Sequence, residues 1–101
     1  MTHHLANSIL FQDDAIISKT LVKNSGGTIT LFAFDKGQAL SEHTTPFEAF
    51  FFVVEGSAKV TINKVDHLVN TGEYILLPAN LPHAVLAESK VKFLLTMIKQ
   101  L

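Results

Sequence analysis

Residues 37–56 of the chain read GQALSEHTTPFEAFFFVVEG, and residues 72–87 read GEYILLPANLPHAVLA. Both stretches place short apolar runs between glycine and proline residues. Glycine admits a positive φ and proline fixes its own φ, so this pattern is typical of strands joined by tight turns. Each stretch also contains a single histidine, His43 in the first and His83 in the second.

The spacing within these stretches resembles the two signature motifs of the cupin superfamily, small β-barrels that usually hold a metal between the motifs. The positions that agree are, in order, Gly37, His43, Gly56, Gly72, Pro78 and His83. In the first motif Thr45 stands at the second histidine position and Ala49 at the glutamate position, with Glu48 one place too early. In the second motif Asn80 replaces a glycine and Ala87 an asparagine. The scaffold positions are present, but only two of the four expected ligands remain.

The resemblance is to small single-domain cupins of the RmlC-like, conserved-barrel type, here with a degenerate metal-binding motif. It implies an all-β fold, a double-stranded β-helix or jelly-roll barrel of two antiparallel sheets. It also implies one cupin domain over residues 1–101, in which residues 1–12 form an N-terminal arm or strand. A length of 101 residues agrees with one domain and one core.

The chain as a whole consists of short runs rich in Val, Ile, Thr and Phe between turn residues, which predicts an all-β sandwich or barrel. No long segment shows the period of an amphipathic helix. The predicted strands cover residues 15–23, 28–35, 47–55, 58–62, 67–69, 74–77, 84–88 and 91–99. Strands at this spacing form a jelly roll, in which two antiparallel sheets pack on each other.

The charge balance excludes several classes of partner. Eight Lys and Arg residues nearly cancel nine Asp and Glu residues, and 48% of the chain is hydrophobic. A compact protein of this kind has no long-range field that would gather nucleic acid or an anionic membrane. We therefore expect neither nucleic acid nor a membrane as a partner.

The absence of cysteine excludes disulfides, Cys-ligated zinc and thiol nucleophiles. The first residues lack the charged and long apolar regions of a secretory signal. Apolar runs such as residues 49–54 are far shorter than the ~20 residues of a membrane helix. We expect a cytoplasmic protein.

The segment from Phe47 to Val54 is apolar at odd and at even positions alike. A strand with two apolar faces needs cover on both sides, whereas an antiparallel sheet commonly leaves one face to water. We predict a homodimer that packs through this sheet, as many cupins do. The alternative is that a terminal strand of the same chain covers the second face.

The candidate site follows from the alternation of side chains along a strand. Residues of one parity share a face, and in a cupin that face is the barrel interior. The predicted ligand pocket is mostly apolar, which is usual for a small-molecule site. It consists of His43, Thr45, Ala49, Phe51, Val53 and His83.

His43 and His83 are the two candidate metal ligands. Catalytic metal sites generally use three protein ligands, so a divalent transition metal (Zn, Ni, Fe or Mn) would be held at partial occupancy. Glu48 has the wrong parity to join them unless a bulge shifts the register. We interpret His67 as a partly buried histidine with one backbone hydrogen bond and Tyr74 as an ordinary strand residue.

Three functional hypotheses remain. The first, which we prefer, is a protein that binds a small organic molecule in an apolar barrel pocket, with His43 and His83 as polar anchors. The second is a cupin enzyme, either a metal-dependent oxygenase or isomerase or a metal-free isomerase or epimerase in which a histidine is the general base. The third is a structural jelly roll with a vestigial site.

Overall fold

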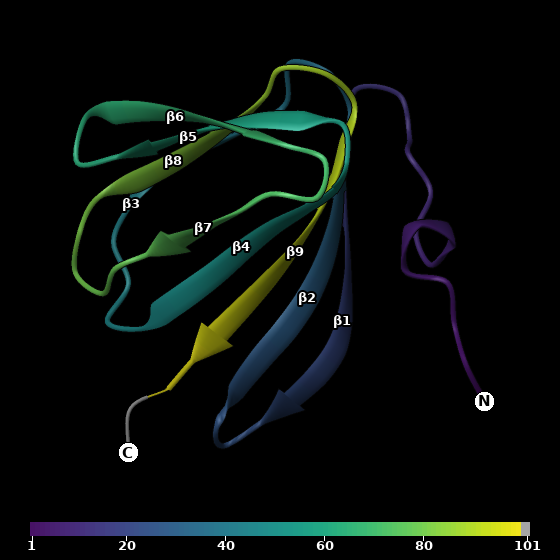
Figure 1. The fold of residues 1–101 in the computed structure, drawn as a ribbon, viewed down its shortest axis with the longest axis horizontal. Helices are drawn as coiled ribbons and strands as arrows, with labels where there is room; N and C mark the ends of the chain where they lie inside the picture. Colours follow the sequence, from purple (N-terminus) through teal and green to yellow (C-terminus); the bar gives the residue numbers. More distant parts are fainter. Residues whose placement is uncertain (100–101) are drawn as a thin grey trace.

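A computed structural model describes residues 1–99 of the chain, and within them the strands form two antiparallel sheets (Figure 1). The predicted all-β jelly roll is therefore confirmed. The five-stranded sheet has the order β1-β2-β9-β4-β7, and its strands are β1 (Ile16–Asn24), β2 (Gly27–Phe34), β9 (Val91–Ile98), β4 (Glu48–Glu55) and β7 (Tyr74–Leu77). The four-stranded sheet has the order β3-β8-β5-β6, with β3 (Ala39–His43), β8 (His83–Ala87), β5 (Ser57–Ile62) and β6 (Val65–Asn70).

The alternation of apolar residues predicted most of these strands but missed β3. Among the described strands this edge strand pairs only with β8, and four of its five residues are exposed, so it carries no alternating pattern. A register shift between Leu40 and His43 further disturbs its periodicity. The strand predicted at residues 67–69 is longer in the structure than predicted: it is β6, which begins at Val65 and ends at Asn70.

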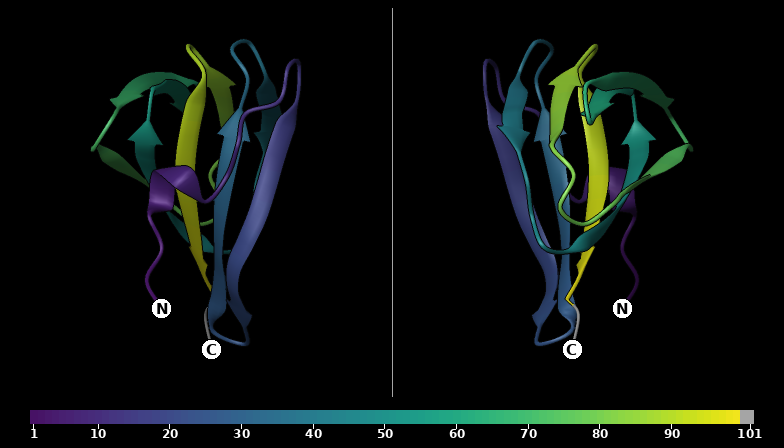
Figure 2. Two further views of the ribbon diagram at one scale, coloured as in Figure 1. Left: turned by 90° about the vertical axis from the view of Figure 1, so that its right-hand side faces the viewer. Right: turned by 90° about the vertical axis from the view of Figure 1, so that its left-hand side faces the viewer.

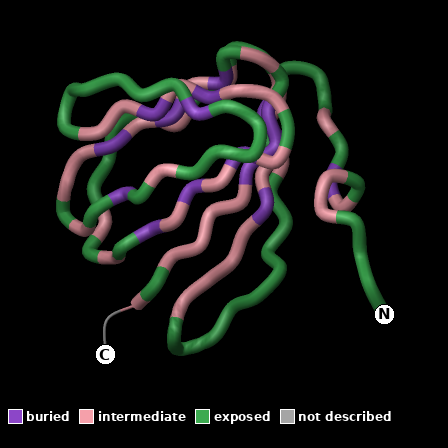
Figure 3. The backbone as a smooth tube through the Cα atoms, in the orientation of Figure 1, coloured by how far each residue is buried: buried purple, intermediate pink, exposed green. Residues whose placement is uncertain are grey.

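The core lies between the two sheets, where their buried faces meet (Figure 3). Its centre is aromatic: the Phe51 and Phe93 rings stack with centroids 4.3 Å apart, and Phe34 meets Phe93 edge to face at 5.0 Å. All three side chains are fully buried. Burying a phenylalanine side chain contributes about 1.5–3 kcal/mol, so this group is a main source of stability.

The N-terminal segment covers part of the other face of the five-stranded sheet, which we call the outer face (Figures 1 and 2). This segment is an arm rather than a strand, with one short 3-10 helix, η1 (Leu5–Asn7). Ile9 is buried against Leu31 and Ala33 of β2. The chain thus covers one part of this face itself.

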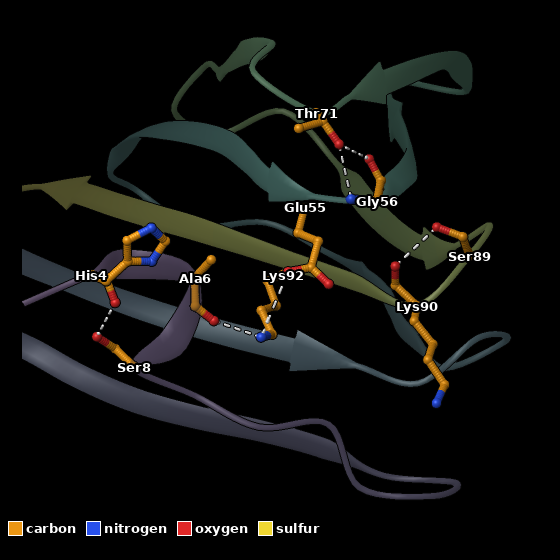
Figure 4. A network of polar contacts seen from close by, with 9 residues as sticks. All are labelled: His4, Ala6, Ser8, Glu55, Gly56, Thr71, Ser89, Lys90 and Lys92. Carbon is orange, nitrogen blue, oxygen red and sulfur yellow. Dashed lines mark hydrogen bonds and ion pairs between the residues drawn. The ribbon is translucent and has the colours of Figure 1, made fainter.

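A buried lysine attaches the arm to the sheet (Figure 4). The Nζ of Lys92 donates to the carbonyl oxygen of Ala6 at 2.6 Å and lies 3.7 Å from a carboxylate oxygen of Glu55. It also lies 5.0 Å from the centroid of the Phe11 ring. A buried ammonium is costly unless it is paired, so these contacts favour the arm in its docked position.

Within residues 1–99 we find no helix with the length and apolarity needed to span a membrane.

The motif glycines Gly56 and Gly72 adopt nearly the same positive φ, +88° and +83°, but in different surroundings. A Cβ at Gly56 would lie 2.1 Å from the carbonyl oxygen of Lys90, whereas a Cβ at Gly72 would meet no atom within 4 Å. The hydroxyl of Thr71 also joins the Gly56 turn, accepting from its N–H and donating to its carbonyl, each at 3.0 Å (Figure 4). Gly56 is therefore restricted by packing as well as by conformation.

We predict that Gly56→Ala destabilises the fold far more than Gly72→Ala, although both changes carry the same conformational strain. Gly72→Ala should lower the free energy of unfolding by about 1 kcal/mol, the cost of a left-handed alanine. Gly56→Ala adds a clash with backbone and should cost roughly 3 kcal/mol or more. Urea unfolding of both variants measures the difference, and equal losses would contradict this account.

Candidate functional site

The two motif histidines come together because β3 and β8 pair side by side. His43 and His83 are register partners, and their ring centroids lie 4.3 Å apart with an angle of 70° between the ring planes. His43 is exposed, whereas only 7% of the His83 surface is accessible. The pair therefore lies at the boundary of the barrel, with the His83 ring in the interior and the His43 ring in solvent.

Backbone carbonyls fix both rings in the same way. The Nδ1 of His43 lies 2.8 Å from the carbonyl oxygen of Ser41, and the Nδ1 of His83 lies 3.3 Å from that of Leu81. Because a carbonyl can only accept, each Nδ1 carries the proton in these contacts. In the neutral form of either ring, Nε2 is then the acceptor, and the described residues supply no hydrogen-bond partner for it.

Burial lowers the pKa of His83 from its ordinary value of 6.5, and the neighbouring His43 lowers it further. The hydrogen bond to Leu81 opposes both effects. Burial acts because it disfavours the charged form, and His43 acts because two imidazolium ions would repel each other. At neutral pH the His83 ring is therefore an uncharged acceptor.

The space beside the histidines is small. A cavity of about 20 Å³ lies there, with room for about one water molecule. Its lining is apolar except for the two imidazoles and consists of Leu40, His43, Phe51, Leu77, His83, Val85, Phe93 and Leu95. Larger hollows of about 270 and 410 Å³ lie away from the histidines, by the β1–β2 hairpin and the arm.

Of the predicted pocket residues, His43, Phe51 and His83 line this cavity. Thr45 does not, because its hydroxyl closes a local turn, donating to the carbonyl of Phe47 at 3.1 Å and accepting from its N–H at 3.2 Å. Ala49 and Val53 are buried in the core.

The remaining lining residues were missed for two reasons. Leu40 lies on β3, the strand without a sequence signal. The other four, Leu77, Val85, Phe93 and Leu95, lie on predicted strands and could have been found from alternation. Which interior residues lie beside the histidines, however, depends on how the two sheets stack.

Other candidate ligands lie away from the pair. Glu48 is exposed and pairs with Ile98 at the start of β4, and the bulge in this strand falls between Val53 and Glu55, too late to turn Glu48 inward. His67 is exposed on β6 rather than partly buried, and Tyr74 is 60% exposed on β7.

Residues 1–99 contain no group of three or more His, Cys, Asp or Glu side chains able to hold a metal. Two imidazoles fall short of the three protein ligands of a usual catalytic site. The residues present therefore do not fit a resident metal by themselves.

The model of the cupin domain family matches residues 30–99, which include both histidines and seven complete strands of the barrel. The chain is a cupin. The matched region extends over most of the chain and agrees with the two-sheet topology described above.

Solved structures agree with this assignment. A conserved Streptococcus pyogenes protein of unknown function is 32% identical, with a TM-score of 0.96 over 100% of this cupin and 89% of that chain. A cupin 2 conserved barrel domain protein from Leptotrichia buccalis is 38% identical, with a TM-score of 0.91 over 94% of this cupin and 46% of that chain.

Protein SchB of Streptomyces halstedii is a curated relative, 29% identical over 70 residues. The match covers 68% of this cupin and 51% of SchB, so it extends over about half of that relative's length.

We predict that the cupin purified without a histidine tag contains much less than one equivalent of transition metal. Two imidazoles leave too many coordination positions to water for tight binding. Plasma mass spectrometry of wild type, His83→Ala and the control His67→Ala measures the content. A stoichiometric metal that only His83→Ala removes would contradict this prediction and show that further groups complete the site.

We also predict that stability falls as the pH drops through the ordinary histidine range. The folded-state pKa of His83 is lowered, so below about pH 6.5 the unfolded chain binds more protons than the folded one. The contribution of His83 is complete above that pH and is lost as the pH falls toward the folded-state pKa. Urea unfolding at pH 8 and pH 5.5 should show a smaller loss for His83→Gln than for wild type or His67→Gln.

Proposed function

We propose that this cupin binds a small organic molecule at the mouth of its barrel, with His43 and His83 as polar anchors. The observation that carries the proposal is a pair of imidazoles in van der Waals reach, each held by a backbone carbonyl through Nδ1. This arrangement leaves both Nε2 atoms to a ligand. Preorganised polar groups beside an apolar surface are the usual composition of a small-molecule site.

Because side chains fill the core, we place the proposed ligand outside it. A cavity of about 20 Å³ cannot enclose an organic molecule, so only a single small group enters beside the rings while the body of the ligand stays at the mouth. The ligand would thus lie farther out than the pocket predicted from the sequence, which was lined by Thr45, Ala49 and Val53.

The hydrogen-bonding capacity of the two imidazole rings indicates which polar group the ligand carries. A neutral Nε2 accepts a hydrogen bond, and the lowered pKa of His83 favours its neutral form. The apolar lining around the rings favours an aromatic or aliphatic body. The ligand class is therefore a compact apolar molecule that carries a hydroxyl or another uncharged donor.

Acid–base catalysis by the same pair is a second candidate, because a basic Nε2 can accept a proton from a bound substrate. The orienting groups are carbonyls of Ser41 and Leu81, which stabilise an imidazolium less than a carboxylate does. Binding is therefore the function that the geometry supports better.

We predict that phenol binds at the histidine pair and that toluene, which has the same shape without a donor, binds roughly 2- to 13-fold more weakly. One hydrogen bond contributes about 0.5–1.5 kcal/mol, equivalent to roughly a 2- to 13-fold difference in affinity. Histidine ring ¹⁵N resonances report the contact, since hydrogen bonding shifts the signal of the acceptor nitrogen. Phenol should move the Nε2 signals of His43 and His83.

Two variants complete the experiment. His43→Ala and His83→Ala should each remove the advantage of phenol over toluene, while His67→Ala on the distant strand β6 should retain it. Equal effects of phenol and toluene on wild type would refute the anchoring role. No shift with either probe would favour the vestigial barrel.

A further inference from the structure

A hollow of about 410 Å³ lies between the N-terminal arm and β1. This volume is in the usual range for a small-molecule site, whereas the cavity beside the histidines has room for about one water molecule. We call it the arm hollow. Its lining consists of His3, Leu5 and Ser8 from the arm and Lys19, Thr20 and Leu21 from β1.

Contacts elsewhere in the arm hold one wall of the hollow in place. Ile9 is buried against β2, and Leu5 packs on the same apolar cluster. The Nζ of Lys92 donates to the carbonyl oxygen of Ala6 in the middle of η1. The arm thus crosses the outer face of the sheet in a defined position before it joins β1 (Figure 2). A wall that is ordered in advance lowers the entropic cost of binding.

A bulge shapes the wall formed by β1. The register of β1 against β2 shifts between Thr20 and Val22, so Leu21 has no register partner in β2. A bulge inserts one residue and turns side chains away from strict alternation. Three consecutive residues, 19–21, consequently border the hollow, and Leu21 keeps 40% of its surface accessible.

Lys19 supplies the charge of the arm hollow. Its Nζ donates to the carbonyl oxygen of Ser8 at 3.3 Å, which places the ammonium between β1 and the arm. An ammonium has three N–H donors, so two remain after this bond. Lys19 makes no ion pair with any of residues 1–99, and none of the six lining residues is acidic. The charge of the hollow is therefore not neutralised by the part of the chain that the structure describes.

We propose that the arm hollow binds a small monocarboxylate with an aliphatic body. The carboxylate accepts hydrogen bonds from the Lys19 ammonium, and the His3 imidazole adds an N–H donor to the lining. Leu5 on one wall and Leu21 on the other supply apolar surface for the body of the ligand.

The lining favours a carboxylate over a phosphate. A phosphate monoester carries about 1.5 to 2 negative charges at pH 7, and arginine is its usual bidentate partner. The chain contains no arginine, and the hollow has one lysine. A single ammonium matches the single charge of a carboxylate.

This site is separate from the histidine pair. The arm hollow lies on the outer face of the five-stranded sheet, whereas His43 and His83 belong to β3 and β8 of the four-stranded sheet. The inference therefore does not depend on the function proposed above.

Hexanoate and hexanamide test the proposal on the untagged full chain, because they share one carbon chain and differ in charge. Each is titrated into the millimolar range while the backbone amide ¹H and ¹⁵N signals are recorded. Hexanoate should move the signals of residues 5–8 and 19–21. Hexanamide should bind roughly 2- to 5-fold more weakly, the difference that an exposed ion pair contributes.

Matched variants assign this preference to Lys19. Lys19→Gln should bind both probes equally, because glutamine can still donate to the Ser8 carbonyl but carries no charge. The control Lys23→Gln removes the same charge from the same strand at a residue outside the lining, and it should retain the preference. Leu21→Ser should weaken both probes alike, since it removes apolar surface and leaves the ammonium in place.

Hydrogen exchange tests whether the ligand contacts both walls. The N–H groups of Asn7 and Ser8 donate to the carbonyls of His4 and Leu5, each at 3.1 Å. A ligand that binds only the docked arm favours that position by mass action. Saturating hexanoate should therefore slow the exchange of these two amides in wild type but not in Lys19→Gln.

Four results would overturn the proposal. The first is the absence of shifts at residues 5–8 and 19–21 with hexanoate, and the second is equal affinity of wild type for the two probes. The third is loss of the preference in Lys23→Gln as well as in Lys19→Gln. The fourth is unchanged exchange of the arm amides, which would mean that hexanoate contacts β1 alone. Shifts confined to His43 and His83 count as the first result and leave the proposed function intact.

Discussion

The pairing of β9 along both of its edges is the constraint on which the rest of this structure depends. β9 joins β2 to β4 across the middle of the five-stranded sheet, and its two faces serve different purposes. The inner face supplies Phe93 to the core and Leu95 to the wall of the histidine cavity. The outer face supplies Lys92, which holds the arm, and Thr96, which pairs with Ile29 on one side and Phe50 on the other.

Core packing also sets the depth of the functional site. The stacked rings of Phe51 and Phe93 occupy the centre of the barrel and leave about 20 Å³ next to the histidines. A protein interior packs as densely as an organic crystal, so a stable aromatic core and a roomy ligand chamber compete for the same volume. In this cupin the core takes the interior, so the ligand that we propose would lie at the mouth, beside His43 and His83.

The sequence predicted the features that depend on local pattern. Within residues 1–99, alternation and turn residues located eight of the nine strands, and the resemblance to the cupin motifs placed His43 and His83 in one site. The pattern failed at β3, where four of five residues face water and the register shifts. It also misjudged Thr45, because parity gives the face of a side chain but not the turn that its hydroxyl closes. The two apolar faces of β4 predicted a homodimer over the outer face; the arm packs on Val54 at one part of that face, and the homodimer stays a prediction.

By itself, then, the sequence determined the all-β fold class, because periodicity and turn residues are properties of the local chain, and the resemblance of its motifs to those of cupins placed His43 and His83 in one site. Only the tertiary structure decided the size of the cavity, the exposure of Glu48 and His67, and which part of the outer face the arm covers. These features depend on how side chains from strands far apart in sequence fill a shared volume, and the pattern of any one strand carries no information about that volume.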